Sequence, residues 1–266
     1  MGTSFDYIWS MRHVKPKKHL GQHFLIDPDV TMQIVNALHL SNHKNILEIG
    51  PGTGVLTEHL MRLDANFKAI EIDKESITHL YLKYPEMGKN LIQDDFLKCD
   101  IESLFHQKFS IIGNFPYNIS SQIFFKILEN IDKIDQVVCM LQREVAQRIA
   151  SPPGKKSYGI LSVLLQVYYD IENLFDVPPD VFNPPPKVWS SVIRLKRNDV
   201  KKLNCDEKLF KTLVKAGFHK RRKTLRNALK SLNLPAEIMA LELLDKRAEQ
   251  LSIGDFEHLA QLVELK

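Results

Sequence analysis

The feature that most constrains the fold is a glycine-rich turn that follows a short apolar segment. Residues 45–49 have the sequence NILEI, which predicts a buried parallel strand, and Gly50, Gly52 and Gly54 come directly after it. Glycines at this point permit a tight turn and let a ligand approach the backbone closely. Residues 55–61 then have the apolar spacing of a helix. A strand, a glycine turn and a helix in this order are typical of the ligand-binding edge of a parallel α/β sheet.

Strand-like and helix-like segments alternate over most of the chain. The predicted strands are 45–49, 68–72, 91–92, 108–113, 136–141, 170–177 and 190–195. A predicted helix over 28–38 precedes the first strand. The predicted helices that separate the strands are 55–61, 74–84, 120–128, 144–149 and 158–167. This order predicts a mostly parallel sheet of the α/β class, and because no helix separates the last two strands, we expect them to pair antiparallel at one edge.

The pattern changes to helices alone after residue 195. Predicted helices cover 207–216, 223–232, 235–243 and 253–263, and their starts have the expected proline or capping residues. We therefore place a domain boundary near 197–204. The predicted organisation is a basic leader over 1–25, an α/β domain over 26–198 and a small all-α domain over 199–266.

The basic residues are concentrated in two segments. The net charge is only +4, but residues 196–231 contain 13 Lys and Arg against 3 Asp and Glu, which leaves 23 against 29 elsewhere. The leader is also basic between Arg12 and His19. Two basic segments beside a mildly acidic body favour a polyanionic partner, most plausibly nucleic acid. The densest cluster, 219–223, has no carboxylate among its expected helical neighbours, although a solvated helix face is the ordinary alternative.

Composition excludes several other classes of protein. The chain has no apolar run long enough to span a membrane and no signal-peptide pattern. Its three cysteines, Cys99, Cys139 and Cys205, have neither zinc-ligand spacing nor the number that a disulfide framework needs. We expect a cytoplasmic protein with no metal and no membrane partner.

The spacing around the glycine turn points to an adenosine ligand without a pyrophosphate. The turn reads G-x-G-x-G, and Val55 stands where the dinucleotide fingerprint needs its third glycine. No Gly-Lys-Ser/Thr follows, so the phosphate-binding loop pattern is absent as well. Glu71 ends the next strand, 21 residues after Gly50, where a carboxylate can accept hydrogen bonds from ribose hydroxyls. Asp95 follows the third strand and could accept from an adenine amino group. The predicted cofactor is S-adenosylmethionine.

The segment Asn114-Phe115-Pro116-Tyr117 follows the predicted strand 108–113. The exocyclic amine of a nucleobase is a poor nucleophile, because its lone pair is delocalised into the ring. The Asn114 side-chain oxygen and the Pro116 carbonyl could accept its two hydrogens and hold it toward a methyl donor, so that positioning supplies most of the rate. Tyr117 offers a face on which a splayed base can stack. An ordinary turn is the alternative, but the position after the glycine turn favours an amino-methyltransferase.

The chain resembles the ribosomal RNA adenine N6-dimethyltransferases, most closely their small-subunit branch, from about Val14 to the C-terminus. The resemblance rests on several motifs in order: 21–25 (GQHFL), 48–54, 71–73, Asp95, 114–120 (NFPYNIS), 142–145 (QREV), 158–162 (YGILS), 182–188 (FNPPPKV) and 218–227 (FHKRRKTLRN). Residues 1–10 match nothing in the family. His23 departs from the usual asparagine, and Phe115 from the usual leucine or isoleucine.

The resemblance implies a Rossmann-like, S-adenosylmethionine-dependent methyltransferase domain and a C-terminal helical domain that contacts RNA. It implies transfer of methyl groups to N6 of two adjacent adenosines near the 3′ end of small-subunit (16S) rRNA, within a small-subunit precursor, by a monomer. The implied catalytic residues are Asn114, Pro116, Tyr117 and Phe182, the last as a second stacking surface or else a core anchor. The implied donor-binding residues are His23, Leu25, Gly50, Gly52, Glu71, Asp95 and Asn114. The implied RNA-binding residues are Lys220, Arg221, Arg222, Lys223 and Arg226.

Three alternative functions stay open. The chain could methylate large-subunit rRNA, or adenine in DNA, or it could be a ribosome-assembly factor in which binding matters more than catalysis. The basic helical tail and the small-subunit-like motifs favour dimethylation of small-subunit rRNA over these alternatives, and the intact Asn114–Tyr117 segment argues against lost catalysis.

Overall fold

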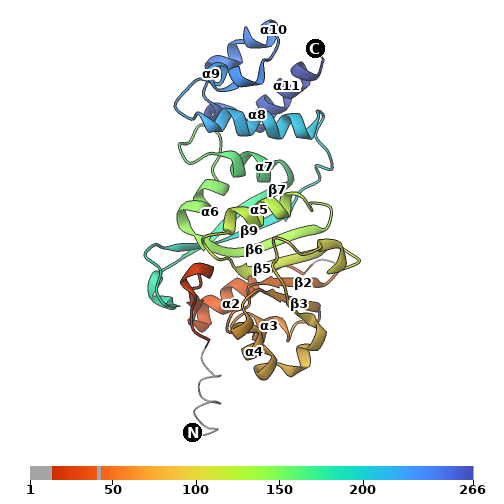
Figure 1. The fold of residues 1–266 in the computed structure, drawn as a ribbon, viewed down its shortest axis with the longest axis vertical. Coiled ribbons are helices and arrows are strands. Elements are labelled where there is room, and N and C mark those ends of the chain that lie inside the picture. Colours follow the sequence, from red (N-terminus) through yellow and green to blue (C-terminus); the bar gives the residue numbers. More distant parts are fainter. Residues whose placement is uncertain (1–13, 41–42, 266) are drawn as a thin grey trace. The chain divides into compact units, whose positions relative to one another are not determined.

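The computed structural model describes residues 14–40 and 43–265 (Figure 1). Arg12, His13 and the unmatched residues 1–10 lie outside these described residues. The chain divides into two compact units, neither of which is continuous in sequence. The first contains the described residues up to Ala146 together with Glu172–Arg197, and the second contains Gln147–Ile171 together with the residues from Asn198 onward.

A seven-stranded sheet with the order β4-β3-β2-β5-β6-β9-β7 forms the centre of the α/β architecture (Figure 1). Its strands are β2 (Asn45–Ile49), β3 (Asn66–Glu71), β4 (Leu91–Gln93), β5 (Phe109–Asn114), β6 (Ile134–Gln142), β7 (Tyr169–Val177) and β9 (Ser190–Arg197). The pairs from β4 to β6 are parallel, whereas β9 runs antiparallel to β6. The predicted mostly parallel sheet is therefore confirmed, with β9 and β7 as neighbours at one edge.

The strand order reverses at β2, and this places the ligand crevice. The chain goes from β2 outward to β3 and β4, and then returns to β5 on the other side of β2. In open α/β sheets, ligands bind outside the carboxyl ends of the strands at such a reversal. Here the ends of β2, β3 and β5 carry Gly50, Glu71 and Asn114.

The helices of the first unit begin where the capping residues predict. The helices that lie wholly within it are α2 (Pro28–Asn36), α3 (Thr57–Leu60), α4 (Lys74–Lys83) and α5 (Ser120–Leu128). Asp27 caps α2 by accepting a hydrogen bond from the Val30 N–H at 2.9 Å, and Pro28 occupies the first turn. Helix α3 is shorter than the predicted 55–61, because the left-handed glycines of the preceding turn delay its start.

The second unit is helical, but it takes more of the chain than the sequence predicts. Its helices are α7 (Ile160–Tyr168), α8 (Glu207–His219), α9 (Leu225–Ala228), α10 (Ala236–Met239) and α11 (Ile253–Glu264), while α6 (Arg143–Ile149) spans the division. The prediction assigned 147–171 to the α/β domain. That segment belongs to the second unit because the apolar α7 packs against α8 and α11. A single boundary along the sequence cannot describe this arrangement, because the chain enters the second unit at residue 147, goes back to the first at residue 172 and enters the second again at residue 198.

Short 3₁₀ segments replace parts of the predicted helices. They are η1 (Lys18–Leu20), η2 (Pro85–Asn90), η3 (Ile101–Ser103), η4 (Pro179–Val181), η5 (Leu229–Leu232), η6 (Glu242–Asp245) and η7 (Ala248–Gln250). The predicted helix 223–232 is thus α9 followed by η5, and 235–243 is α10 followed by the first part of η6.

A two-stranded pairing that the sequence did not predict fixes the leader. Strand β1 (Phe24–Leu25) runs antiparallel to β8 (Phe182–Asn183), with Phe24 opposite Asn183 and Leu25 opposite Phe182. The leader thereby lies beside the proline-rich segment 178–187, more than 150 residues away in sequence.

Candidate active site

A cavity of about 270 Å³ lies at the carboxyl edge of the sheet. Its walls come from the leader, from the ends of β2, β3 and β5, and from the segment after β4. Most of the predicted site residues line it: His23, Gly50, Gly52, Glu71, Asp95, Asn114, Pro116 and Tyr117. The structure therefore brings these eight predicted residues to one cavity.

The glycine turn has the conformation and the space that a bound ligand needs. Gly50, Gly52 and Gly54 have φ angles of +67°, +57° and +81°, in the left-handed region that favours glycine. A Cβ on Gly52 would lie 2.9 Å from the Phe24 ring, so this position has no room for a side chain. A Cβ on Gly50, by contrast, meets no heavy atom of the described residues within 4 Å. The backbone at Gly50 is therefore open to a ligand.

Glu71 is a buried carboxylate held by backbone N–H groups. Its Oε2 accepts from the Gly52 N–H at 3.1 Å, and its Oε1 accepts from the Asp73 N–H at 2.9 Å. Burial raises the pKa of Glu71, and these backbone hydrogen bonds oppose the rise. A carboxylate has about four acceptor positions, so Glu71 keeps capacity for ribose hydroxyls at the cavity.

Asp95 lies in the segment after β4 and is held by its own turn. Its Oδ1 accepts from the Leu97 N–H at 3.0 Å, and Lys98 Nζ lies 3.5 Å from its Oδ2. The preceding Asp94 donates its N–H to the Glu71 carbonyl at 3.1 Å, which ties this segment to the end of β3. Asp95 is thus fixed beside Glu71 on the same side of the cavity.

Glu48 is a buried acid that the sequence analysis did not single out. Its side chain accepts a 2.6 Å hydrogen bond from the Thr57 hydroxyl, and the residue is 1% exposed. Burial raises the pKa of Glu48 to about 8; the Thr57 bond lowers it, and the negative charge of Glu71 raises it further. The signal in the sequence was an acidic residue inside the otherwise apolar segment 45–49.

Asn114 has a fixed amide orientation. Its Nδ2 donates to the His23 carbonyl at 2.8 Å, and because that oxygen can only accept, the NH₂ group must face it. Among the described residues, Asn114 Oδ1 has no hydrogen-bond partner, so it remains an acceptor. The second predicted acceptor, the Pro116 carbonyl, receives the Ile119 N–H at 3.2 Å and retains one lone pair.

Tyr117 and His23 form one aromatic side of the cavity. Their ring centroids are 5.3 Å apart with 29° between the planes, and the Tyr117 hydroxyl lies 2.5 Å from the Ser190 hydroxyl. The His23 ring contacts the Pro184 carbonyl through Nδ1 at 2.8 Å. Burial raises the pKa of Tyr117, so its phenol stays neutral. His23 therefore orients Tyr117, and its backbone carbonyl orients Asn114.

Two predicted site residues lie elsewhere, and the reason is the β1–β8 pairing. Phe182 is 2% exposed and Leu25 is 4% exposed, and both belong to the hydrophobic core of the first unit. Neither lines the main cavity. Phe182 therefore has the buried position of a core anchor, which is the alternative that the sequence left open. Leu25 borders only a small cavity of about 30 Å³ behind the glycine turn.

The comparisons with known proteins show the family of the chain. The family model for ribosomal RNA adenine dimethylase matches residues 13–264. The chain belongs to the ribosomal RNA adenine dimethylase family. A "Ribosomal RNA small subunit methyltransferase A" from Cytophaga hutchinsonii is 54% identical and covers 95% of this chain and 99% of its own length. One of the same name from Parabacteroides distasonis is 52% identical, with 94% of each chain covered.

Solved structures show the same fold. A dimethyladenosine transferase from Plasmodium falciparum has a TM-score of 0.77 at 26% identity, with 91% of this chain and 98% of that chain covered. The 23S rRNA methyltransferase ErmE has a TM-score of 0.67 at 23% identity, with 90% and 99% covered. The Rossmann-like methyltransferase fold of this dimethylase is thereby established.

S-adenosylmethionine, the cofactor of this methyltransferase fold, suits the groups that line the cavity. The open backbone at Gly50 allows close contact, and Glu71 has spare acceptor positions for hydroxyl donors. The apolar residues Phe96 and Leu97 lie beside Asp95, as an adenine ring requires. Among the described residues, no group of three or more His, Cys, Asp or Glu side chains could hold a metal ion.

The basic cluster 219–223 of the dimethylase is not helical after His219. Arg221 in this cluster, and Arg226 just after it, form hydrogen bonds within the second unit. Helix α8 ends at His219, and the next residues form a turn. Arg221 donates to the carbonyls of Lys156 and Tyr158 at 2.5 and 3.0 Å, and lies 3.4 Å from the Glu249 carboxylate. The sequence analysis considered only the helical neighbours of this cluster, whereas the carboxylate partner of Arg221 is 28 residues away in sequence.

Arg226 is held in the same way, whereas three exposed residues between 220 and 223 are not. Arg226 Nη2 donates to Asp245 at 2.8 Å and to the Leu241 carbonyl at 3.1 Å. Lys220, Arg222 and Lys223 are exposed and have no ion-pair partner among the described residues.

In the part of the chain that the structure describes, no helix could cross a membrane.

Proposed function

We propose that this dimethylase transfers methyl groups from S-adenosylmethionine to N6 of two adjacent adenosines near the 3′ end of small-subunit (16S) rRNA. The products are N6-dimethyladenosines made during ribosome biogenesis. The names of the 50–54% identical relatives support the small subunit as the source of the substrate. The observation that carries the chemistry is Asn114, whose amide is fixed by the His23 carbonyl with its oxygen left to accept from an amine.

The residues around Asn114 act by orientation. When bound, S-adenosylmethionine supplies an electrophilic methyl group. Asn114 Oδ1 and the Pro116 carbonyl accept the two hydrogens of the adenine amine, which favours the pyramidal nitrogen and turns its lone pair toward the donor side of the cavity. Tyr117 stacks on the flipped base, and His23 keeps the tyrosine ring in place. No strong base is required, since the amine becomes acidic only as its new bond forms.

The donor side is formed by the leader and by three strand ends. Glu71 accepts from the ribose hydroxyls, Asp95 accepts from the adenine amino group of the donor, and the backbone at Gly50 and Gly52 contacts the remainder. The leader contributes the backbone of His23, whereas the buried Leu25 supports the turn from behind.

The exposed basic residues Lys220, Arg222 and Lys223 contact the RNA backbone, while Arg221 and Arg226 keep the helical unit in shape. In this proposal the α/β domain holds the reacting groups, and the C-terminal helical domain recognises the small-subunit precursor. The protein acts as a monomer in the cytoplasm. The three cysteines are buried and unpaired, as is usual for proteins of a reducing compartment.

Substrate choice is tested with labelled S-adenosylmethionine and three acceptors. Immature small subunits from a strain that lacks these methyl groups, large subunits, and adenine-containing DNA are each incubated with the wild-type protein. We expect label in small-subunit rRNA alone. Label in large subunits or DNA but not in small subunits would refute the proposal and support one of the alternatives.

A further inference from the structure

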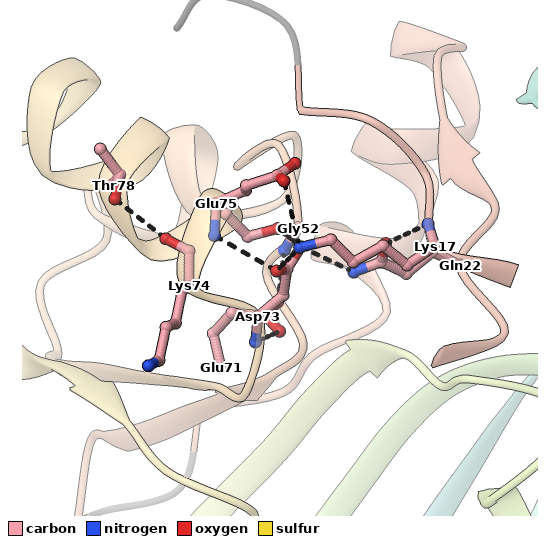
Figure 2. A network of polar contacts seen from close by, with 9 residues as sticks. Lys17, Gln22, Gly52, Glu71, Asp73, Lys74, Glu75 and Thr78 are labelled. Atoms are coloured by element: carbon pink, nitrogen blue, oxygen red, sulfur yellow. Dashed lines mark hydrogen bonds and ion pairs between the residues drawn. The ribbon is translucent and has the colours of Figure 1, made fainter. Parts of the chain in front are cut away.

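One polar network joins the leader to the donor side of the cavity (Figure 2). Lys17 Nζ forms an ion pair with Asp73 Oδ1 and lies 3.5 Å from Glu75 Oε1. Gln22 Nε2 donates to Asp73 Oδ2 at 3.3 Å, and Gln22 Oε1 accepts from the Lys17 N–H at 2.8 Å. Two leader side chains therefore meet on a single carboxylate.

Asp73 also organises the residues behind it. Its Oδ1 accepts from the Glu75 N–H at 3.2 Å and its Oδ2 from the Ser76 hydroxyl at 3.1 Å, so it caps helix α4. Its own N–H donates to Glu71 Oε1 at 2.9 Å. One residue thus contacts the leader, the start of a helix and the carboxylate assigned to the donor ribose.

The charge of Asp73 is not needed for capping, since Ser, Thr or Asn cap helices as well. A charge is needed to pair with Lys17. The Lys17 and Asp73 side chains are 26% and 2% exposed, so this pair is shielded from solvent more than a surface ion pair. The hydrogen bond from Lys17 Nζ to Asp73 raises the pKa of Lys17. Burial alone would raise the pKa of Asp73, but the bonds from Lys17 and Gln22 keep it below its ordinary value.

The other end of the leader is fastened to the opposite side of the cavity. Asn118 Nδ2 donates to the His19 carbonyl at 3.2 Å, and Asn114 Nδ2 donates to the His23 carbonyl at 2.8 Å. Gly21 between them has a φ of +65°, and a Cβ there would lie 2.7 Å from Asn118 Oδ1. Residues 19–24 form one wall of the cavity between these two attachments.

We propose that Lys17 and Asp73 are positioning residues for the methyl donor: their ion pair holds the leader in place as a wall of the cavity and so sets the affinity for S-adenosylmethionine. The inference rests on the proposed function, because it takes the cavity to be the donor site. Neither residue needs to touch the donor, since Lys17 acts through the leader and Asp73 acts through Glu71 and the leader.

Three substitutions isolate the ion pair. Lys17→Met keeps the aliphatic chain and removes the charge, and Lys17→Arg restores a cation. Asp73→Asn removes the charge and keeps one oxygen, which can accept from the Glu75 N–H or from Gln22 Nε2 but not from both. Lys18→Met is the matched control, because Lys18 is exposed and has no ion-pair partner among the described residues. All four are made in the full-length chain.

The dissociation constant for S-adenosylmethionine is measured by calorimetry without RNA, so that methyl transfer does not enter. We expect Lys17→Met and Asp73→Asn each to weaken binding about tenfold, the size of a coupling between contacting charged groups. Because both remove the same pair, the double variant should be about as weak as either single one. Lys17→Arg should stay within about threefold of wild type, and Lys18→Met should match it.

Hydrogen exchange of the amides in residues 18–25, measured in the donor-free protein, supplies an independent readout. Faster exchange in Lys17→Met, with an unchanged melting temperature, supports the proposal. Wild-type affinity together with wild-type exchange in Lys17→Met would overturn it. If the wild-type protein itself neither bound the donor nor methylated small-subunit rRNA, the proposed function would fail instead, so the two failures are distinguishable.

Discussion

The carboxyl edge of the sheet and the basic segment after α8 both carry residues that the sequence assigns to the substrate, but they hold them differently. At the sheet edge, the Asn114 side-chain NH₂ donates to a backbone carbonyl, and its side-chain oxygen stays available to the cavity. In the basic segment, the Arg221 guanidinium donates to two carbonyls and a carboxylate of its own unit. A polar residue of a motif can therefore be assigned to a ligand only if its hydrogen bonds within the protein leave a donor or acceptor unused.

The comparison also separates neighbouring residues of one motif. Arg221 and Arg222 are adjacent and chemically identical, yet only Arg221 has partners within the described part of the second unit. The first should contribute to stability and the second to RNA binding. Four predictions follow this contrast from the largest expected effect to the smallest.

Asn114→Ala should reduce the rate of methyl transfer by about 100-fold or more, because it removes the acceptor that orients the amine. The dissociation constant for S-adenosylmethionine should change by about tenfold at most, since the leader loses its attachment at the His23 carbonyl but the Lys17–Asp73 ion pair and Glu71 remain. Single-turnover kinetics and calorimetry measure the two effects separately. Asn130→Ala is the control, because the Asn130 side chain donates to the Lys126 carbonyl near the end of α5 and does not line the cavity. A donor-binding loss as large as the rate loss would contradict the assigned role.

Glu48→Gln should change how stability depends on pH. The pKa of Glu48 is about 8 in the folded protein and near 4.5 when unfolded, so the unfolded chain releases this proton first as the pH rises. The stability from the protonated acid is complete below pH 4.5 and is lost progressively up to about pH 8. The wild type should therefore lose up to about 1.4 kcal/mol per pH unit relative to Glu48→Gln across this window. Urea unfolding of both proteins at pH 5, 6.5 and 8 measures the difference; parallel pH curves would rule out a protonated Glu48.

Arg221→Ala should lower the free energy of unfolding by about 2 kcal/mol, since the carbonyls of Lys156 and Tyr158 lose a charged donor. Arg222→Ala should change it by less than about 0.5 kcal/mol. Urea denaturation curves of the two variants test the contrast directly. Equal losses would show that both arginines are structural, or that neither is.

Arg222→Ala and Lys223→Ala should instead weaken binding to immature small subunits by a few-fold each. Each should lower the slope of log affinity against log salt by about 1, because one phosphate contact is lost. Filter binding at several salt concentrations measures the slope. An unchanged slope in both variants would remove these residues from the RNA interface.

The sheet-edge residues could be predicted from the sequence because their partners are local or fixed by topology. Glu71 and Asn114 end their strands, and Gly50 and Asp95 come just after theirs. Parallel strands bring their carboxyl ends to one edge whatever lies between them. The spacing of strands and turns was therefore enough to predict this cavity.

The errors concern contacts that no local pattern records. The β1–β8 pairing buries Phe182, the return of residues 147–171 enlarges the helical unit, and Glu249 pairs with Arg221. Each joins segments that are far apart in sequence and that carry no periodic signal of their own. The Lys17–Asp73 ion pair, which spans 56 residues, belongs to the same class.

The central claim is tested most directly by mapping the methyl groups that the wild-type protein adds to immature small subunits lacking them. Mass spectrometry of nuclease fragments of the 16S rRNA locates each modified base. The account predicts N6-dimethyladenosine at two adjacent adenosines near the 3′ end, and only a few per cent of this product with Asn114→Ala after the same reaction time. Methylation at any other base, or the same amount of product with Asn114→Ala, would contradict it.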